Sequence, residues 1–192
     1  MPNLKISPRA LKVIDTSIQL FDLYGFKKVG VDFILEETQI AKMTFYKYFK
    51  SKEGLIEMCM DLQKDRLKQE VFAIIYSCRH LTAADKLKEI YRLHADLNSP
   101  YHLFFKAIFE IKKLYPKAYQ VVVEYRKWLV QEILELLSDM ETPILKPDVD
   151  LFLFMIDGAM VRLLSGGSRN QPEICSESWA KLGLVKLILR VS

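Results

Sequence analysis

The chain has 192 residues, of which 51% are hydrophobic and 27% are charged, and this composition excludes a predominantly disordered protein. The net charge of +4 arises entirely within the first 52 residues, which hold nine lysines and arginines against five acidic residues. A local basic segment is typical of a surface that contacts phosphates, although a solvated lysine face has the same composition.

No stretch reaches the roughly 18 consecutive apolar residues that a membrane span requires. The longest candidate, residues 149–164, is interrupted by Asp150, Asp157 and Arg162. The N-terminus has no apolar segment of the kind that a signal peptide needs. We therefore expect a cytoplasmic protein without a membrane partner.

Enzyme and metal signals are weak in this sequence. The three cysteines, Cys59, Cys78 and Cys175, are scattered and form no CxxC pair, which argues against a disulfide framework or a zinc knuckle. Redox sensing through a pair of them stays an alternative. There is no HExxH pattern and no glycine-rich phosphate loop that precedes a helix. We expect no catalytic site, no metal and no cofactor.

Apolar residues recur at helical spacing along the whole chain, and the segments are separated by start and stop signals. Ser7 and Pro8 provide an N-cap hydroxyl followed by proline at the first helical position, and Gly25 ends that helix. Ser51 and Thr82 are the expected caps of two later helices. The sequence predicts an all-α fold of about nine helices, over residues 8–24, 31–38, 42–49, 51–78, 82–98, 101–114, 116–140, 147–165 and 176–190.

Three short helices at the start of the chain, the last two joined by a tight turn, predict a helix-turn-helix. Its expected core consists of apolar residues from both helices and the turn: Val31, Ile34, Leu35, Ile40, Phe45 and Phe49. The remaining residues of the third helix would face outward, and most carry a hydroxyl or an ammonium group suited to phosphates and base edges: Lys42, Met43, Thr44, Tyr46, Lys47 and Tyr48.

The segment GVDFILEETQIAKMTFYKYFKSKEGL, residues 30–55, resembles the signature of TetR-family (TetR/AcrR) regulators. The matching positions are Val31 and Ile34 in the second helix, Lys42, Thr44, Phe45, Tyr46 and Phe49 in the third, Lys50, Ser51, Lys52, Glu53 and Leu55 at the start of the fourth, and Phe21, Gly25 and Phe26 at the end of the first. The resemblance implies a three-helix DNA-binding head in residues 1–52 and a larger helical domain for ligand binding and dimerisation in residues 53–192.

The resemblance also implies which residues meet double-stranded DNA. The expected set is Lys28, Gly30, Lys42, Thr44, Tyr46, Lys47, Tyr48, Lys50 and Lys52. For Tyr48, packing against the fourth helix is an equal alternative.

Four positions depart from the family pattern. Gln39 stands where the turn usually carries glycine, and Ala41 stands where serine or threonine usually caps the recognition helix; the missing cap costs about 1 kcal/mol. Val29 and Gly30 replace the usual threonines before the second helix. These departures leave the core pattern intact, but they motivate a second hypothesis, a ligand-binding helical dimer whose DNA head has degenerated.

The region after residue 57 carries no further motif of the family, and only its helical periodicity can be interpreted. A pocket for a small apolar or aromatic effector is expected from Tyr91, His94, His102, Phe105, Phe109, Trp128, Met155 and Arg162, each of which can also be an ordinary core or surface residue. A homodimer interface is expected from Phe152, Ile156, Met160, Leu182, Val185 and Leu189, with packing inside one chain as the alternative.

Together these features predict a sequence-specific transcriptional regulator that binds a palindromic operator as a dimer and responds to a ligand. Repression, rather than activation, follows from the family resemblance alone. A small all-α enzyme is a third hypothesis, which would need a cluster of titratable residues that the sequence does not display.

Overall fold

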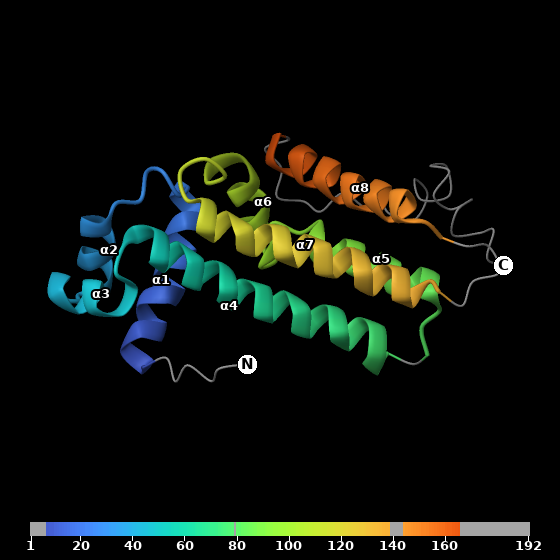
Figure 1. The fold of residues 1–192 in the computed structure, drawn as a ribbon, viewed down its shortest axis with the longest axis horizontal. Coiled ribbons are helices and arrows are strands. Elements are labelled where there is room, and N and C mark those ends of the chain that lie inside the picture. The colour runs from blue at the N-terminus through green and yellow to red at the C-terminus, as the bar shows by residue number, and fades with distance from the viewer. Residues whose placement is uncertain (1–6, 79, 139–143, 166–192) are drawn as a thin grey trace. The chain divides into compact units, whose positions relative to one another are not determined.

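The computed structural model describes residues 7–78, 80–138 and 144–165, and over these residues the fold is all-α and contains no strand, as predicted. Eight α-helices and one short π-helical segment make up this part of the chain (Figure 1). Their bounds are α1 Pro8–Tyr24, α2 Val31–Thr38, α3 Lys42–Phe49, α4 Lys52–Phe72, η1 Ala73–Ser77, α5 Ala83–His94, α6 Tyr101–Glu110, α7 Pro116–Leu136 and α8 Lys146–Ser165. The predicted ninth helix, residues 176–190, lies outside the described residues.

The predicted helix caps are present. The Ser7 hydroxyl accepts a hydrogen bond from the backbone N–H of Ala10 at 3.2 Å, and the Thr82 hydroxyl accepts one from Asp85 at 3.1 Å. Each bond satisfies a backbone donor that has no partner inside its helix. Gly25 follows α1 with φ of +82°, a conformation that favours glycine.

Three helices end earlier than predicted, and local chemistry explains two of them. The fifth ends at His94 rather than near Asn98, because the Asp96 carboxylate accepts the Asn98 backbone N–H at 2.9 Å and forms a competing turn. The sixth ends at Glu110 rather than Leu114, and it is followed by a turn in which the N–H groups of Leu114 and Tyr115 both donate to the Ile111 carbonyl. The seventh ends at Leu136, four residues before its predicted end.

The chain divides into two compact units. Unit 1 contains the described residues up to Lys68 together with His102–Tyr125, and unit 2 contains Gln69–Tyr101 together with the described residues from Arg126 onward. Unit 1 therefore holds more than the predicted head of residues 1–52, because parts of α4, α6 and α7 pack with it. The functional division at residue 52 stays a prediction.

The core of unit 1 contains two pairs of packed aromatic rings. The rings of Phe21 and Phe26 stack with their centres 5.0 Å apart, and those of Phe104 and Tyr125 meet edge to face at 5.2 Å. All four side chains are fully buried, so both pairs contribute apolar area that stabilises the unit.

Cys59 lies in the same core and is fully buried. Burial, with a smaller contribution from the charge of Asp15, raises the pKa of its thiol far above the ordinary value. The reactive thiolate is therefore scarce at this position, which does not suit a redox sensor.

Two kinds of feature are absent from the part of the chain that the structure describes. None of its helices combines the length and the apolar character needed to cross a membrane. No group of three or more histidine, cysteine or acidic side chains is arranged there to hold a metal ion.

Candidate nucleic-acid interface

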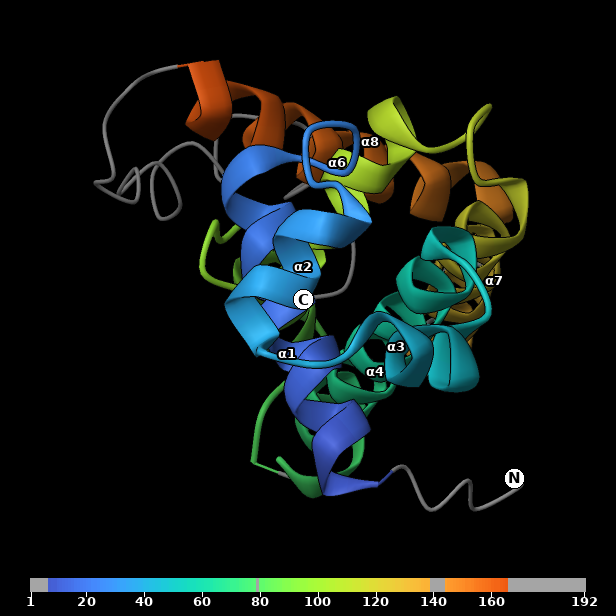
Figure 2. The same ribbon diagram turned by 90° about the vertical axis from the view of Figure 1, so that its left-hand side faces the viewer.

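Helices α2 and α3 follow each other at one end of unit 1 (Figures 1 and 2) and are joined by a short turn, which is the arrangement of a helix-turn-helix. Ile34 of α2 and Phe45 of α3 are fully buried, and the Phe45 ring lies 5.2 Å from that of Phe49. The other predicted core residues, Val31, Leu35 and Ile40, are half-buried. The apolar positions thus anchor both helices as the sequence predicted.

The turn between the two helices contains the departures seen in the sequence. Gln39 has φ of 56° and ψ of 36°, the left-handed conformation that glycine adopts most easily. Its side-chain amide donates to the Glu36 carbonyl at 2.6 Å, a local bond that partly offsets the strain. Ala41, the N-cap of α3, makes no side-chain cap bond. The turn therefore forms without its usual residues, at a cost in stability.

With its core side anchored, α3 presents the rest of its surface to solvent. Met43 is 84% exposed and Tyr46 is 41% exposed. Lys47 is exposed as well, whereas Thr44 and Tyr48 are half-buried. Five of the nine residues predicted to meet DNA belong to α3, and the structure places all five on its outward or flanking surface: Lys42, Thr44, Tyr46, Lys47 and Tyr48.

The lysines around α3 differ in their surroundings. The Lys42 ammonium lies 3.4 Å from the Asp32 carboxylate of α2, and both side chains are largely exposed, so the pair contributes little to stability. Lys50 has φ of 63° and donates to the Lys47 carbonyl at 3.2 Å. Lys28, in the loop before α2, is exposed.

Lys52 has a structural contact that sequence reasoning did not predict. Its ammonium donates to the Phe26 carbonyl at 2.6 Å and lies 5.5 Å from the centre of the Tyr115 ring. These partners are 26 and 63 positions away along the chain, so no local pattern indicates them. A phosphate contact by Lys52 stays a prediction.

The start of α4 approaches the end of α3 closely. A Cβ atom at Gly54 would stand 2.2 Å from the Phe49 carbonyl oxygen, far inside van der Waals contact. The Ser51 hydroxyl accepts the Gly54 backbone N–H at 3.0 Å, which is the cap that the sequence predicted. Glycine at position 54 therefore permits this close crossing.

The eight residues predicted to line an effector pocket are divided between the two units. Unit 1 holds His102, Phe105 and Phe109, and Phe109 is 68% exposed. Unit 2 holds Tyr91, His94, Trp128, Met155 and Arg162, of which His94 is fully buried and Arg162 is exposed. The effector pocket itself stays a prediction.

Unit 2 contains a partly buried polar cluster, of which the sequence predicted only one member. The Arg126 guanidinium donates to both Asp157 carboxylate oxygens at 2.8 Å and to the Tyr101 hydroxyl at 2.5 Å. Burial lowers the pKa of Arg126, but the hydrogen bonds that it donates to Asp157 and the neighbouring negative charge outweigh this effect, so the net pKa is raised and the group stays charged. The His94 ring meets the Tyr101 ring edge to face at 4.7 Å. Of these four residues, only His94 was among those predicted for the effector pocket. The four lie on four separate helices, so no local sequence pattern indicates that they meet.

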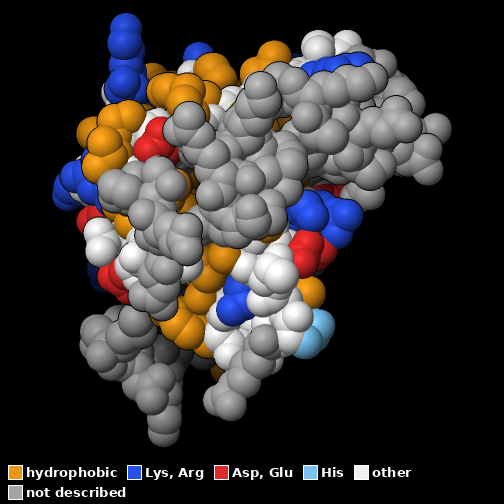
Figure 3. All heavy atoms as spheres, turned by 90° about the vertical axis from the view of Figure 1, so that its right-hand side faces the viewer, with side chains coloured by type: hydrophobic (Ala, Val, Ile, Leu, Met, Phe, Trp, Pro, Cys, Tyr) orange, Lys and Arg blue, Asp and Glu red, His pale blue; other side chains and the backbone are white. Residues whose placement is uncertain are grey.

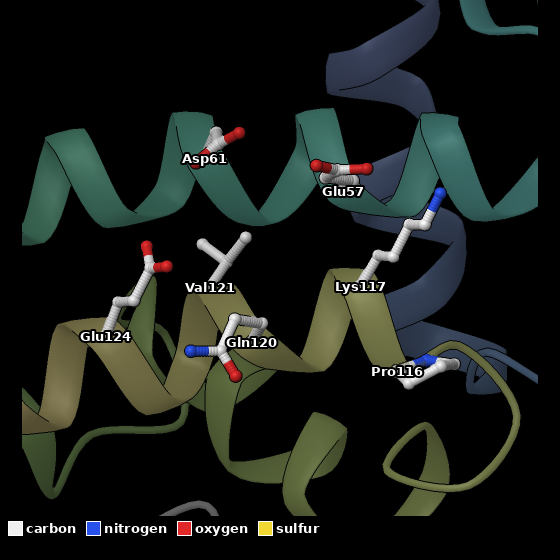
Figure 4. Close-up of a pocket in the computed structure, with 7 residues that line it drawn as sticks. All are labelled: Glu57, Asp61, Pro116, Lys117, Gln120, Val121 and Glu124. Carbon is white, nitrogen blue, oxygen red and sulfur yellow. The ribbon is translucent and has the colours of Figure 1, made fainter.

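An open groove of about 530 Å³ lies in unit 1 between α4 and the first half of α7 (Figure 4). Figure 4 shows Glu57 and Asp61 on α4, with Lys117 and Glu124 extending from α7 toward them. The full lining is Glu57, Asp61, Pro116, Lys117, Gln120, Val121 and Glu124. The groove is lined mainly by polar side chains and includes none of the residues predicted for the effector.

Three residues of the dimer prediction lie on α8, and the interface itself stays a prediction. Phe152, Ile156 and Met160 are at most 3% exposed within a single chain, so they belong to the core of the protomer. The reason is that α8 is apolar on two faces, and packing inside the chain takes the face that these three residues share. The large apolar residues left exposed on α8 are Leu151, Phe154, Val161 and Leu164. The other predicted interface residues, Leu182, Val185 and Leu189, lie outside the described residues.

Exposed apolar side chains also appear among charged ones on the face of the molecule shown in Figure 3. Such residues are common singly on protein surfaces, so a row of them along one helix is more informative than their number.

Comparison with known proteins agrees with this geometry. Residues 13–59 match the family model described as bacterial regulatory proteins, tetR family. No curated protein matches the chain. A TetR-family transcriptional regulator from Streptomyces coelicolor superposes with a TM-score of 0.78 at 23% identity, covering 97% of this chain and 91% of that one.

Two further solved structures have the same fold. A TetR transcriptional regulator from Legionella pneumophila has a TM-score of 0.74 at 13% identity, with 98% of this chain and 100% of that chain covered. The fatty acid degradation regulator FadR from Bacillus halodurans has a TM-score of 0.67 at 16% identity, with 97% and 94% covered. Residues 13–59 of this protein therefore match the TetR family in sequence, and nearly the whole chain has the fold of the TetR-family regulators named above.

Proposed function

We propose that this protein is a ligand-responsive repressor that binds a palindromic DNA operator as a homodimer, with α3 in the major groove. The observation that carries the proposal is the two-sided character of α3. Phe45 and Phe49 fix the helix in the core, while Met43, Tyr46 and Lys47 project from it. A recognition helix needs both an anchored side and a side that reaches base edges.

Charge supports the same assignment. The first 52 residues carry the entire net charge of +4, and Lys28, Lys42, Lys47 and Lys50 are exposed there. Phosphate contacts from such lysines displace condensed counterions, which makes the affinity fall steeply as salt rises. In this proposal Thr44 and Lys47 contact base edges, and Tyr46 with the surrounding lysines contacts phosphates.

We place the dimer contact on the exposed face of α8. Leu151, Phe154 and Val161 recur there at intervals of three and seven residues, with Gly158 between them. Burial of this row against a second copy would remove apolar side chains from water, and the two-fold axis would present two recognition helices to two half-sites. Phe154→Glu is expected to give a monomer in analytical ultracentrifugation, whereas Lys127→Glu, at an exposed position on α7, is expected to leave the dimer intact.

We place effector binding in unit 2, beside the cluster of Tyr101, Arg126 and Asp157. Two residues of the predicted pocket, Tyr91 and Trp128, belong to the same unit and are half-buried, and aromatic side chains are common in small-molecule sites. An effector lowers operator affinity only if it binds the DNA-competent state less tightly than the other state. A compound that raises the melting temperature but leaves operator affinity unchanged contradicts this role.

Selection of genomic fragments by the purified protein, followed by sequencing, tests the DNA-binding function. We expect a palindromic consensus whose affinity is weakened by Thr44→Ala and by Lys47→Ala. Lys127→Ala serves as the matched control, because it removes an exposed lysine that lies outside the helix-turn-helix. If no fragment is enriched at any salt concentration, the regulator proposal fails.

That outcome would favour the second candidate, a ligand-binding helical dimer with a degenerate head. The strained conformation of Gln39 and the uncapped start of α3 at Ala41 are the observations that favour it. Retained effector binding together with absent DNA binding would identify this case.

A further inference from the structure

One face of α6 contacts the end of α1 and the loop that leads to α2, all within unit 1. His102, Lys106 and Glu110 are spaced by four residues, so they lie in a row on the same side of the helix. Each of them meets a group between Asp22 and Phe26. We call this row, His102, Lys106 and Glu110, the α6 row.

Lys106 acts on the C-terminal end of α1. Its ammonium donates to the backbone carbonyl of Asp22, in the last turn of that helix. Carbonyls at a helix C-terminus have no partner inside the helix and carry partial negative charge, which favours a nearby cation. The last turn of α1 contains no basic residue of its own, so α6 supplies the missing cation.

Glu110 acts on the loop itself. Its carboxylate accepts the Phe26 backbone N–H at 2.8 Å. A Cβ atom at Gly25 would stand 2.8 Å from the same carboxylate oxygen, so the glycine makes room for the approach as well as adopting its positive φ. A charged acceptor strengthens such a hydrogen bond relative to a neutral one.

The backbone of Phe26 is thereby held on both sides of its α-carbon. Its N–H binds Glu110, its carbonyl accepts from Lys52 at 2.6 Å, and its ring stacks on Phe21 in the core. Helix α2 begins five residues later, at Val31. The position of the Phe26 peptide therefore constrains where the helix-turn-helix starts.

His102 completes the row in a different way. Its Nδ1 lies 2.8 Å from the Asp22 carboxylate, but the alignment is not that of a hydrogen bond, and within the described part of the chain neither ring nitrogen has a hydrogen-bond partner. The side chain is buried, so it fixes the spacing between α6 and α1 mainly by packing.

We propose that Lys106 and Glu110 are positioning residues for DNA recognition: they hold the α1–α2 loop so that α2 and α3 keep the orientation that the operator requires. The inference rests on the proposed DNA-binding function. It adds two residues to those that determine DNA recognition. Both lie more than 50 positions beyond the helix-turn-helix, and in this proposal neither contacts DNA.

The test compares Glu110→Ala with Glu110→Gln in the full-length dimer, on a fragment enriched by the wild-type protein. Loss of the charged acceptor in Glu110→Ala is expected to lower operator affinity about tenfold. Glu110→Gln keeps an oxygen that accepts the Phe26 N–H and is expected to recover most of the affinity. Lys106→Met is expected to weaken binding, whereas Lys113→Met and Glu124→Ala, at exposed positions of unit 1, are expected to leave it unchanged.

Two further measurements distinguish a residue that holds the α1–α2 loop from one that contacts DNA. The slope of log affinity against log salt is expected to stay at the wild-type value in Glu110→Ala, because no phosphate contact is removed. Amide hydrogen exchange of residues 25–38 is expected to be faster in Glu110→Ala and near wild type in Glu110→Gln, with or without DNA.

The proposal is overturned if Glu110→Ala folds and binds the operator as tightly as the wild type. It is also overturned if Glu110→Gln fails to restore operator affinity while amide exchange at residues 25–38 is unchanged in Glu110→Ala. If the wild-type protein itself enriches no fragment, the DNA-binding function fails. The exchange measurement then still decides whether Glu110 holds the α1–α2 loop. Unchanged exchange in Glu110→Ala overturns the claim that it does.

Discussion

The α-carbon of Gly54 faces the carbonyl oxygen of Phe49 so closely that a Cβ atom would lie 2.2 Å from it. This contact joins the end of α3 to the first turn of α4, and both groups are backbone, so neither side can move aside cheaply. The glycine is therefore a steric requirement of the crossing between the recognition helix and the helix that follows it.

Gly54→Ala is expected to lower the free energy of unfolding by about 2 kcal/mol, since overpacking against fixed backbone forces the two helices apart. Urea denaturation followed by circular dichroism measures the change. Gly158→Ala is the matched control, with both glycine variants made in the Phe154→Glu background so that the proposed dimer contact is absent: a Cβ at Gly158 would meet no atom of its own chain within 4 Å, and alanine is the better helix former by about 1 kcal/mol, so this variant is expected to be more stable. An unchanged midpoint for Gly54→Ala would contradict the steric argument.

Gln39→Gly is expected to raise the free energy of unfolding by about 1 kcal/mol, because glycine has no Cβ penalty in the left-handed conformation that Gln39 adopts. Gln39→Ala keeps the Cβ and loses the bond to the Glu36 carbonyl, so it is expected to be less stable than the wild type. Thermal melts of the three proteins measure both effects. Equal melting temperatures for the glycine and alanine variants would show that strain at this residue is unimportant.

Asp32→Asn is expected to raise operator affinity about threefold at low salt, a size that matches the small energies of exposed ion pairs. Asp32 is exposed at the start of α2 and holds the Lys42 ammonium at 3.4 Å, so its removal leaves Lys42 available to a phosphate and removes a repulsive charge. Titration of labelled operator gives the affinity, with Asp65→Asn as a control at another exposed carboxylate. The gain should vanish at high salt, because screening weakens exposed charges; a gain that persists there contradicts the explanation.

Stability is expected to fall as the pH falls from about 6.5 toward 4, owing to His94. Burial lowers the pKa of His94 to about 4, from an ordinary value of 6.5 in the unfolded chain. Between these values the unfolded state binds more protons, so stability is present in full above pH 6.5 and is lost on acidification, by at most about 3 kcal/mol. Urea denaturation at pH 7.5 and 5.0 measures the difference.

His94→Gln is expected to reduce that pH dependence, whereas His80→Gln, at an exposed histidine, is expected to keep it. If His94→Gln and the wild type lose the same stability between the two pH values, other groups are responsible for the acid sensitivity.

Local chemistry made much of the fold predictable from sequence. The caps at Ser7, Ser51 and Thr82 and the bounds of α2 and α3 depend on neighbouring residues, and the structure agrees with each of them. The shorter fifth and sixth helices were harder to predict, because they depend on competition between helix and turn at Asp96 and at Ile111.

Contacts between distant residues explain what the sequence concealed. The bond between Glu110 and Phe26 spans 84 positions, and the Arg126–Asp157 pair spans 31, so no helical period indicates either. On α8, Phe152 and Phe154 point to different faces, one buried and one exposed. Periodicity showed that the helix has apolar faces but could not determine which one packs inside the chain.

The most direct test of the central claim is the salt dependence of operator binding by the wild type and by Lys47→Ala. If α3 contacts DNA, log affinity falls linearly with log salt concentration, and Lys47→Ala lowers the affinity. If Lys47 also neutralises a phosphate, the substitution changes the slope by about one. The same affinity and slope for both proteins would contradict the placement of this residue at the DNA. No salt-dependent binding by the wild type would contradict the account of this protein as a DNA-binding regulator.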